Sequence, residues 1–426
     1  MSTVTKAGIL VAGLCAWFIK VTLGQPSAPI DLRVTGEMSS PTYYVSTLGS
    51  ATNGGTQISP WSLSFALTQL APGVTVTLMP GIYNGPVMIP ANVSGTAQLP
   101  ITIKSQFKWA AVIANATNGT LEGISVNARH TSYLILDGFC VSNNMGDGLA
   151  VNNYSVVKNC WITRNHQQGI NLTSPTCSNN VVEYNLVENN GVNPPAVPGS
   201  GHWHGLYLSG PNNIVRGNVF RNNTNGYGMI LYTENAGGQN WNNTIYDNLV
   251  YGSINRWGVA LWGAVDGGAQ PGTNYFFNNT VDGGIYTGYG TVFFTNNIIL
   301  PALTDQSVAI ANLGGFNGSA AIAADYNLCT LAIAPAGSSN SIGGHNSVTR
   351  SVGFVNITNG LYWLSATSAA RGMACTNQVP PSDFFGNPQS QVTDVGAFQY
   401  SAACASDTRI LYAPPLSAPD YWVPLY

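Results

Sequence analysis

The chain has 426 residues and a formal net charge of −3, and only 7% of its residues are charged, where about 25% is usual for soluble proteins. With 14 Lys and Arg in total, it lacks the clustered positive charge that binds nucleic acid or anionic membranes. The hydrophobic content of 45% allows a large core, and the 48 Gly and 45 Asn residues favour β-structure with tight turns over a helical bundle.

Residues 1–26 form the first predicted element. Lys6 precedes an apolar run over residues 7–19, which is shorter than the about 20 residues that span a bilayer. A basic residue followed by a short apolar run is typical of a secretory signal peptide. We therefore expect a signal peptide or a short anchor at 1–26, and an extracellular protein that is secreted or held at the cell surface.

A strand, a helix and a second strand are predicted over residues 43–83. Ser59-Pro60 is typical of a helix start and Pro72-Gly73 of a helix end. The apolar face of this helix consists of Trp61, Leu63, Phe65, Ala66 and Leu70. We interpret the helix as an N-terminal cap over the repeated structure that follows, because a stack of repeats must protect its open end.

Seven similar segments follow between residues 135 and 300. They are ILDGFCVSN, VVKNCWITRN, VVEYNLVENN, IVRGNVFRNN, TIYDNLVYGS, YFFNNTVDGG and VFFTNNIIL, and they align Asn185, Asn218, Asn248, Asn279 and Asn297 in one column. When such segments stack in parallel, the apolar side chains at alternate positions point into a shared core. Each Asn side-chain amide then forms a hydrogen bond with the next rung. The repeat predicts an all-β fold, a single right-handed parallel β-helix (solenoid) over 42–400 with regular rungs at 134–300.

Charged residues of alternating sign occupy a second column, two positions before the Asn column. They are Asp137, Lys158, Glu183 and Arg216. Stacked at about 4.8 Å, they predict a solvent-facing ion ladder that fixes the register of the rungs. A carbohydrate-binding stripe is the alternative interpretation of the same column.

The C-terminal part divides into two predicted regions. Residues 301–400 hold the last rungs and a closing segment, and Cys375 with Cys404 is the disulfide pair that we expect to fasten it. The Pro-rich and aromatic tail at 405–426 is typical of a docking strand and predicts self-association or surface attachment. Ten Asn-x-Ser/Thr sequons permit N-glycosylation, although Asn richness alone generates many of them.

Both ends of the predicted solenoid carry family-like motifs. The opening YYVS…PWSL…PGIY (43–83) resembles the start of secreted β-helix repeat proteins of the pectin-lyase-like superfamily. YWLSATSAARGMA (362–374) and DVGAFQY (394–400) are similar to their closing segment, with Gln399 where Glu is usual and Val74 where the opening usually has Asp. The resemblance implies a polysaccharide-binding groove along one sheet. Because members range from lyases, epimerases and hydrolases to proteins without known activity, the function must be argued from the site.

Aromatic and ionisable residues gather on three consecutive predicted rungs after the loop at 192–199. The group consists of His202, His204, Tyr207, Tyr227, Tyr232, Glu234, Arg256, Trp257 and Trp262, with Asn171 one rung earlier. Aromatic faces beside hydrogen-bonding groups suit a sugar ring. The sequence therefore predicts a polysaccharide as the partner, and no nucleic acid.

The residue types in this group fit the chemistry of uronic acids. β-Elimination or C5 epimerisation needs a base, a proton donor and a group that neutralises the sugar carboxylate. We predict that His204 is the base, Tyr207 the proton donor and Arg256 the carboxylate clamp. The other members of the group, together with Asn171, are predicted to bind the substrate. A secreted lyase or C5-epimerase is the favoured function.

Other functions of a polysaccharide-binding groove need different residues. Polygalacturonase-like hydrolases carry acidic residues at the columns that His204, Gly226 and Tyr227 occupy here, and hydrolysis needs such a pair of carboxyl groups. Because these three residues are not acidic, the sequence argues against a hydrolase. The pair His202 and His204 lacks a third metal ligand, and no carboxylate cluster offers Ca²⁺ enough oxygens, so we predict no metal and no other cofactor. A non-catalytic structural or adhesive protein, fibre-like or tailspike-like, remains the alternative.

Overall fold

The computed structural model describes one large part of the chain in detail. The described residues are 41–114, 126–173, 177–192, 203–223, 225–233, 240–253, 257–264, 272–288, 290–301, 308–312, 321–334, 340–386, 389 and 393–402. The chain divides into the units Met1–Arg33 and Val34–Tyr426, and every described residue belongs to the second. The predicted signal peptide, Cys404 and the tail at 405–426 lie outside the described residues.

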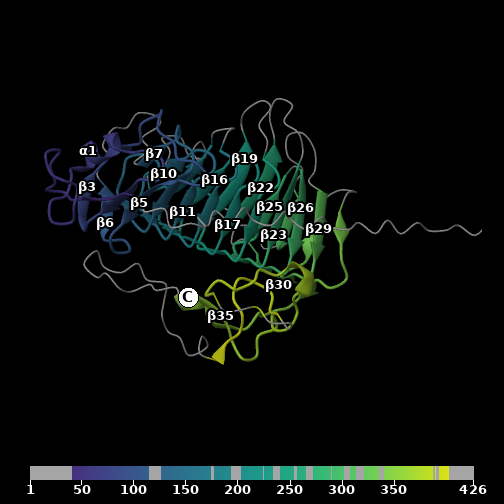
Figure 1. Ribbon diagram of the computed structural model, residues 1–426. Helices are drawn as coiled ribbons and strands as arrows, with labels where there is room; N and C mark the ends of the chain where they lie inside the picture. Colours follow the sequence, from purple (N-terminus) through teal and green to yellow (C-terminus); the bar gives the residue numbers. More distant parts are fainter. Residues whose placement is uncertain are drawn as a thin grey trace, which may run out of the picture. The chain divides into compact units, whose positions relative to one another are not determined.

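The described residues form a parallel β-helix in which each rung contributes short strands to three parallel sheets (Figure 1). The first sheet consists of β1 (Thr42–Val45), β2 (Thr75–Leu78), β5 (Ile101–Ser105), β8 (Leu134–Asp137), β11 (Val156–Lys158), β14 (Val181–Glu183), β17 (Ile214–Arg216), β20 (Thr244–Tyr246), β23 (Thr273–Phe277), β26 (Thr291–Thr295), β29 (Ala321–Asp325) and β32 (Ser341–Ile342).

The second sheet consists of β3 (Gly81–Asn84), β6 (Ala111–Ala114), β9 (Cys140–Ser142), β12 (Trp161–Thr163), β15 (Leu186–Glu188), β18 (Val219–Arg221), β21 (Leu249–Tyr251), β24 (Thr280–Asp282), β27 (Ile298–Leu300), β30 (Leu328–Cys329) and β33 (Ser347–Val348). The third sheet consists of β4 (Val87–Met88), β7 (Val126–Ala128), β10 (Leu149–Val151), β13 (Ile170–Leu172), β16 (Leu206–Leu208), β19 (Met229–Thr233), β22 (Val259–Ala264), β25 (Ile285–Thr287), β28 (Ile310–Asn312) and β31 (Ile333–Ala334). The predicted all-β solenoid is confirmed.

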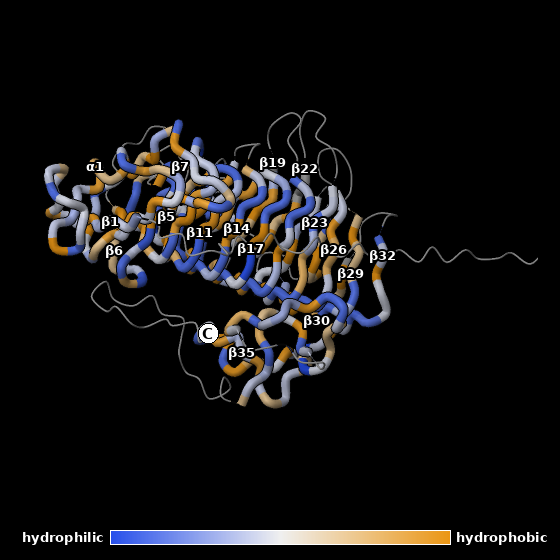
Figure 2. Tube along the Cα trace, in the orientation of Figure 1, coloured by the Kyte–Doolittle hydropathy of each residue, from blue (hydrophilic) through white to orange (hydrophobic). Residues whose placement is uncertain are grey.

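Apolar side chains at alternate positions fill the interior of the stack. Val157, Val182, Val215 and Ile245 are paired neighbours in the first sheet, and none of them is exposed to solvent. The alternation of apolar and polar residues along the rungs is visible in Figure 2. Since each rung alone cannot bury its apolar side, the stacking of neighbours supplies the core.

Buried asparagines hold the rungs together at the corners. In the predicted column, Asn218 Nδ2 donates to Asn248 Oδ1 at 3.0 Å, and the backbone N–H of Asn218 donates to the same oxygen at 3.0 Å. The pattern repeats through Asn279 and Asn297, so this column is confirmed. Two further Asn ladders occupy the other corners: Asn180, Asn213, Asn243 and Asn274, and Asn144, Asn165, Asn190 and Asn223.

The predicted ion ladder runs along the first sheet. Lys158 Nζ lies 3.6 Å from Asp137 Oδ2, and Arg216 Nη2 lies 2.6 Å from Glu183 Oε2. All four side chains are partly exposed, so each pair adds little stability. The register places the four residues directly above one another, which confirms the predicted column.

The helix α1 (Leu63–Thr68) is shorter than predicted. It begins after Ser62, whose side chain accepts a hydrogen bond from the Phe65 N–H at 3.4 Å, and it ends at Gln69. The predicted start at Ser59-Pro60 is wrong because Trp61 forms a bridge with Val45 in extended backbone and stacks on Tyr43 at 4.2 Å. Ala66 is buried in the core. That this short helix caps the solenoid stays a prediction.

A closing segment packs on the outer face of the second sheet. It contains the antiparallel pair β34 (Phe354–Asn356) and β35 (Leu361–Leu364), with the short 3-10 helices η1 (Ile357–Asn359) and η2 (Thr376–Gln378). Trp363 and Phe398 belong to one buried cluster with Leu186, Val219 and Leu249 of the second sheet. No helix among the described residues is long and apolar enough to span a membrane.

Candidate functional site

The outer face of the third sheet carries most of the predicted site residues that the structure describes. The strand register places Ala150, Asn171, Tyr207, Ile230, Ala260 and Tyr286 in one outward column, from β10 to β25. Asn171 and Tyr207 are therefore neighbours on adjacent rungs, as the sequence predicts. Within this column, Tyr207 on β16 and Tyr286 on β25 are the aromatic residues, and the aliphatic Ile230 and Ala260 lie between them.

Beside this column, side chains accept hydrogen bonds from the backbone of the next rung. Asp147 Oδ1 accepts from the Gln168 N–H at 2.8 Å, and Gln168 Oε1 accepts from the His204 N–H. His204 Nδ1 in turn accepts from the Tyr227 N–H at 2.9 Å. An Asp, a Gln and a His thus play the same structural role in one column: each side chain accepts a backbone N–H from the next rung.

His204 is held tightly within this column. Its side chain is 2% exposed, its ring stacks on Tyr227 with centroids 5.2 Å apart, and it meets Tyr207 edge-on at 5.5 Å. Because Nδ1 accepts a backbone N–H, the neutral imidazole carries its proton on Nε2. A general base needs an available lone pair, so this geometry weighs against the predicted role of His204 as the base, which stays a prediction.

Aromatic rings surround a small buried floor on β19 and β22. Tyr227, Ile230 and Ala260 are buried, and Tyr207, Tyr232, Trp257 and Tyr286 pack against them. The rings of Tyr207 and Tyr232 stack with their centroids 6.4 Å apart, and the ring centroids of Trp257 and Tyr286 are also separated by 6.4 Å. Burial raises the pKa of Tyr286, and nearby Tyr227 raises it further, so Tyr286 stays a neutral phenol. Such a surface suits the apolar face of a sugar ring.

Four residues of the predicted site need separate comment, because the structure does not describe their side chains. Trp262 lies in β22, but a register shift after Leu231 pairs Tyr232 with Gly263. Tyr232 and Trp262 are therefore not paired across adjacent strands, since a bulge adds a residue that the sequence pattern does not reveal. The side chain of Trp262, together with His202, Glu234 and Arg256, lies outside the described residues, so the roles predicted for them are untested.

Next to the predicted residue Asn171 lie three polar residues that the sequence analysis missed as site residues, namely Asp147, Thr173 and Arg129. Asn171 Nδ2 donates to Asp147 Oδ2 at 2.5 Å, and its Oδ1 accepts from the Thr173 N–H at 3.0 Å. Arg129 Nη2 donates to Thr173 Oγ1 at 3.2 Å. Arg129 was missed because β7 lacks the Gly-apolar-x-apolar signature. Its position directly after an alternating segment was the available signal.

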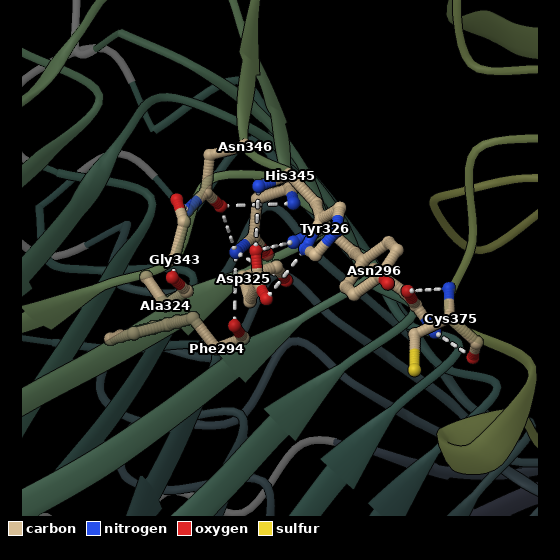
Figure 3. Close-up of polar contacts among 10 residues, drawn as sticks. Phe294, Asn296, Ala324, Asp325, Tyr326, Gly343, His345, Asn346 and Cys375 are labelled. Atoms are coloured by element: carbon tan, nitrogen blue, oxygen red, sulfur yellow. Dashed lines mark hydrogen bonds and ion pairs between the residues drawn. The ribbon is translucent and has the colours of Figure 1, made fainter.

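A separate polar group lies at the corner between the first and second sheets (Figure 3). Asp325 accepts from His345 Nδ1 at 3.0 Å and from the backbone N–H groups of His345 and Tyr326, and the two rings stack at 4.2 Å. The carboxylate orients an exposed imidazole there, but these residues do not belong to the face of the third sheet. Within the described ranges, no three His, Cys, Asp or Glu side chains are placed to hold a metal ion.

These features define a right-handed parallel β-helix with a pectin-lyase-like fold. The family model for the Pel9A-like right-handed β-helix region matches residues 43–227, which include the strands β1 to β18 and the column from Asp147 to Tyr227. A comparison with curated protein sequences gives no match.

Solved structures with similar folds include several enzymes. Pectate lyase Pel9A has 17% sequence identity and a TM-score of 0.55, with 85% of this chain and 96% of that chain covered. XylC in complex with xylose has 10% identity and a TM-score of 0.48, covering 84% and 98%. An alginate lyase from Paenibacillus sp. str. FPU-7 has 16% identity and a TM-score of 0.44, covering 72% and 99%. Likeness at this level of identity shows the fold alone.

Proposed function

We propose that the protein is an extracellular enzyme that binds a uronic-acid-containing polysaccharide along the third sheet and acts on it as a lyase or C5-epimerase. The observation that carries this proposal is the aromatic surface of Tyr207, Tyr232, Trp257 and Tyr286 around the buried floor of Ile230 and Ala260. A sugar ring buries its apolar face on such rings, while nearby polar groups fix its orientation.

The two reactions share their first step. A base takes the proton from C5 of the uronic acid while a cation neutralises the adjacent carboxylate, the roles predicted for His204 and Arg256. The proton donor then decides the product. Protonation of the leaving glycosidic oxygen gives elimination, and protonation of C5 from the opposite face gives the epimer. Tyr207 faces outward beside His204 and Tyr232, which suits the donor role.

The test is incubation with pectate, alginate and glycosaminoglycan polymers, followed by the ultraviolet absorbance of unsaturated products and the epimer ratio by NMR. Tyr207→Phe should lower the rate about 10²- to 10⁴-fold if Tyr207 transfers a proton. Tyr275→Phe is the matched control, because Tyr275 stacks on Phe293 in the first sheet. A wild-type protein that leaves every polymer unchanged would rule out the enzymatic function.

His204 requires a more careful substitution because it also holds the backbone of Tyr227. Gln168 does the same work one rung earlier through its Oε1, so His204→Gln should keep the hydrogen bond and remove the imidazole. We expect its folding to be unchanged and its rate to fall. A full rate in His204→Gln would show that the histidine is structural only.

A non-catalytic glycan-binding protein is the second candidate function. The engagement of His204 Nδ1 and the 2% exposure of its side chain favour it, because a buried ladder residue cannot readily exchange protons with a substrate. Binding of an acidic polymer without any product, measured by affinity electrophoresis, would support this alternative over the enzyme.

A further inference from the structure

We propose that the C-terminal end of the solenoid is an interface that joins two copies of this chain end to end across a two-fold axis. The last rung consists of β31, β32 and β33, and each of these strands is the last of its sheet. Figure 2 shows β32 at the end of the stack. The proposal concerns assembly, and it does not depend on the proposed enzymatic function.

Side chains of the core are exposed at this end. Ile342 pairs with Ala324 and Val348 pairs with Cys329, so both side chains continue columns that point into the core. Ala324 and Cys329 are 2% and 1% exposed, whereas Ile342 is 41% and Val348 62% exposed. A stack of repeats needs a polar surface over its last rung. Two exposed core side chains therefore indicate that a partner covers this rung.

The strand edges of the last rung lack the usual protection against pairing. Residues 341–349 contain no proline, and His345 is the one ionisable residue among them, whereas exposed edges usually carry Lys, other charges or Pro. The edge of β1 at the opposite end is occupied. There the Tyr44 N–H donates to the Gly55 oxygen at 2.8 Å, and the Trp61 N–H donates to the Tyr44 oxygen at 2.9 Å. Among the described residues, the last rung is thus the end that offers strand edges to a partner.

The last rung is complementary to itself, which favours a second copy as the partner. β32 and β33 have two residues each and lie symmetrically about the bond between Gly344 and His345. A two-fold axis through this corner would place β32 of each copy antiparallel to β33 of the other, with Ile342 opposite Ser347 and beside Val348 of the second copy. Because a two-fold rotation preserves the handedness and pitch of the solenoid, the two last rungs would stay one strand spacing apart all along.

The corner on the proposed axis is fixed in advance. Asp325 accepts hydrogen bonds from both Nδ1 and the backbone N–H of His345 at 3.0 Å, and the His345 ring stacks on Tyr326 at 4.2 Å (Figure 3). Such a corner loses little conformational freedom when a partner binds. The same axis would put the third-sheet faces of both copies on one side of the dimer.

Sedimentation velocity of the full chain over a range of concentrations measures the association, and we expect a monomer–dimer equilibrium. Ile342→Lys and Val348→Lys should each raise the dissociation constant of the dimer at least about 100-fold, because the two-fold axis introduces each charge twice into an apolar contact. Leu48→Lys is the matched control, since Leu48 is 94% exposed just after β1. This variant should dimerise like the wild type, and circular dichroism checks that all three variants fold.

A disulfide tests the symmetry of the dimer. A Cβ at Gly344 meets no other atom within 4 Å, and the same is true of Gly54 near the opposite end. Across the axis, the Cα atoms of the two copies of residue 344 would approach to roughly 6 Å, which a disulfide spans. On oxidation, Gly344→Cys should therefore give a covalent dimer that reductant separates, and Gly54→Cys should not.

Three results would overturn the interface. The first is a wild-type protein that stays monomeric at every concentration. The second is an unweakened dimer in both Ile342→Lys and Val348→Lys. The third is a Gly344→Cys protein that forms no more covalent dimer than Gly54→Cys, since the copies would then not meet across this corner.

Discussion

Asp247 is an acid in an unfavourable place for a negative charge. It is 5% exposed, it adopts a left-handed backbone with φ of 53°, and its Oδ1 has no hydrogen-bond partner. Burial raises its pKa well above the usual value, Asp383 of the closing segment raises it further, and Arg216 opposes this. The folded protein therefore favours the protonated carboxyl.

This arrangement predicts a pH dependence of stability. An acid whose pKa is raised on folding has no effect below its unfolded pKa of about 4, and it destabilises the protein as the pH rises toward the folded pKa. Asp247→Asn should therefore raise the free energy of unfolding by at least ~1 kcal/mol at pH 7, with no difference near pH 4. Thermal unfolding of both proteins across this range checks it, and a constant difference would contradict it.

Single residues show how far the sequence could predict the site. Asn171, His204 and Tyr207 were found because they align with a visible Gly-apolar repeat, and they do meet on one face. The tautomer of His204 depends on a backbone N–H from the next rung, which the sequence does not display. The repeat could not show that the pKa of Asp247 is raised, because Asp383, which contributes to that shift, belongs to the closing segment and is far away in the chain.

At the scale of the repeated element, each Asn in the middle of a ladder makes several hydrogen bonds. Asn218 is fully buried, donates to the backbone oxygens of Val182 and Arg216, and both donates to and accepts from its Asn neighbours. A partly satisfied buried network is worse than an apolar one. Removing one Asn side chain from the middle of the ladder should therefore destabilise the fold.

Asn218→Ala should lower the free energy of unfolding by ~3 kcal/mol or more, because it leaves buried carbonyl and amide groups without partners. Urea denaturation followed by circular dichroism measures the loss. Asn92→Ala is the control, since Asn92 is exposed, and its effect should stay within about 0.5 kcal/mol. Similar losses in both variants would contradict the special role of the ladder.

The elements were predictable where the sequence repeats and not where it departs from the repeat. The rungs from β8 to β27 follow directly from their alternation and the Asn column. The start of α1 was missed because Trp61 pairs with Val45, a contact between residues that lie far apart in the chain. The bulge after Leu231 was missed because an extra residue leaves the apolar pattern of each single strand intact.

At the scale of the whole second unit, the closing segment is tied to the rungs it covers. The Tyr362 hydroxyl donates to Asp282 Oδ2 at 2.5 Å, and Tyr362 is 2% exposed. Burial raises the pKa of Asp282, and the bond from Tyr362 lowers it. The segment was predicted from family-like motifs, but its place on the second sheet was not, because the motifs say nothing about which sheet they contact.

Tyr362→Phe should lower the free energy of unfolding by ~1–3 kcal/mol at pH 7, since it leaves a buried carboxylate without its donor. The loss should shrink as the pH falls toward 4, because the pKa of Asp282 is raised in the folded protein and its carboxylate gains a proton there first. Chemical denaturation at the two pH values measures it. Tyr44→Phe, at a half-exposed position on β1, should change little, and a pH-independent loss in Tyr362→Phe would contradict the expected cause.

The corner ladders also bear on how the protein ages. Asparagine followed by glycine loses its amide when the next backbone nitrogen attacks the side-chain carbonyl, and Asn190-Gly191 is such a pair. In the fold, Asn190 Nδ2 donates to the Ile162 oxygen at 3.0 Å, and the Gly191 nitrogen donates to the Asn165 oxygen at 2.9 Å. The attacking atom is thus turned away from its target. The hydrogen bonds that stack the rungs protect the amides that form them, so deamidation of this pair must await local unfolding.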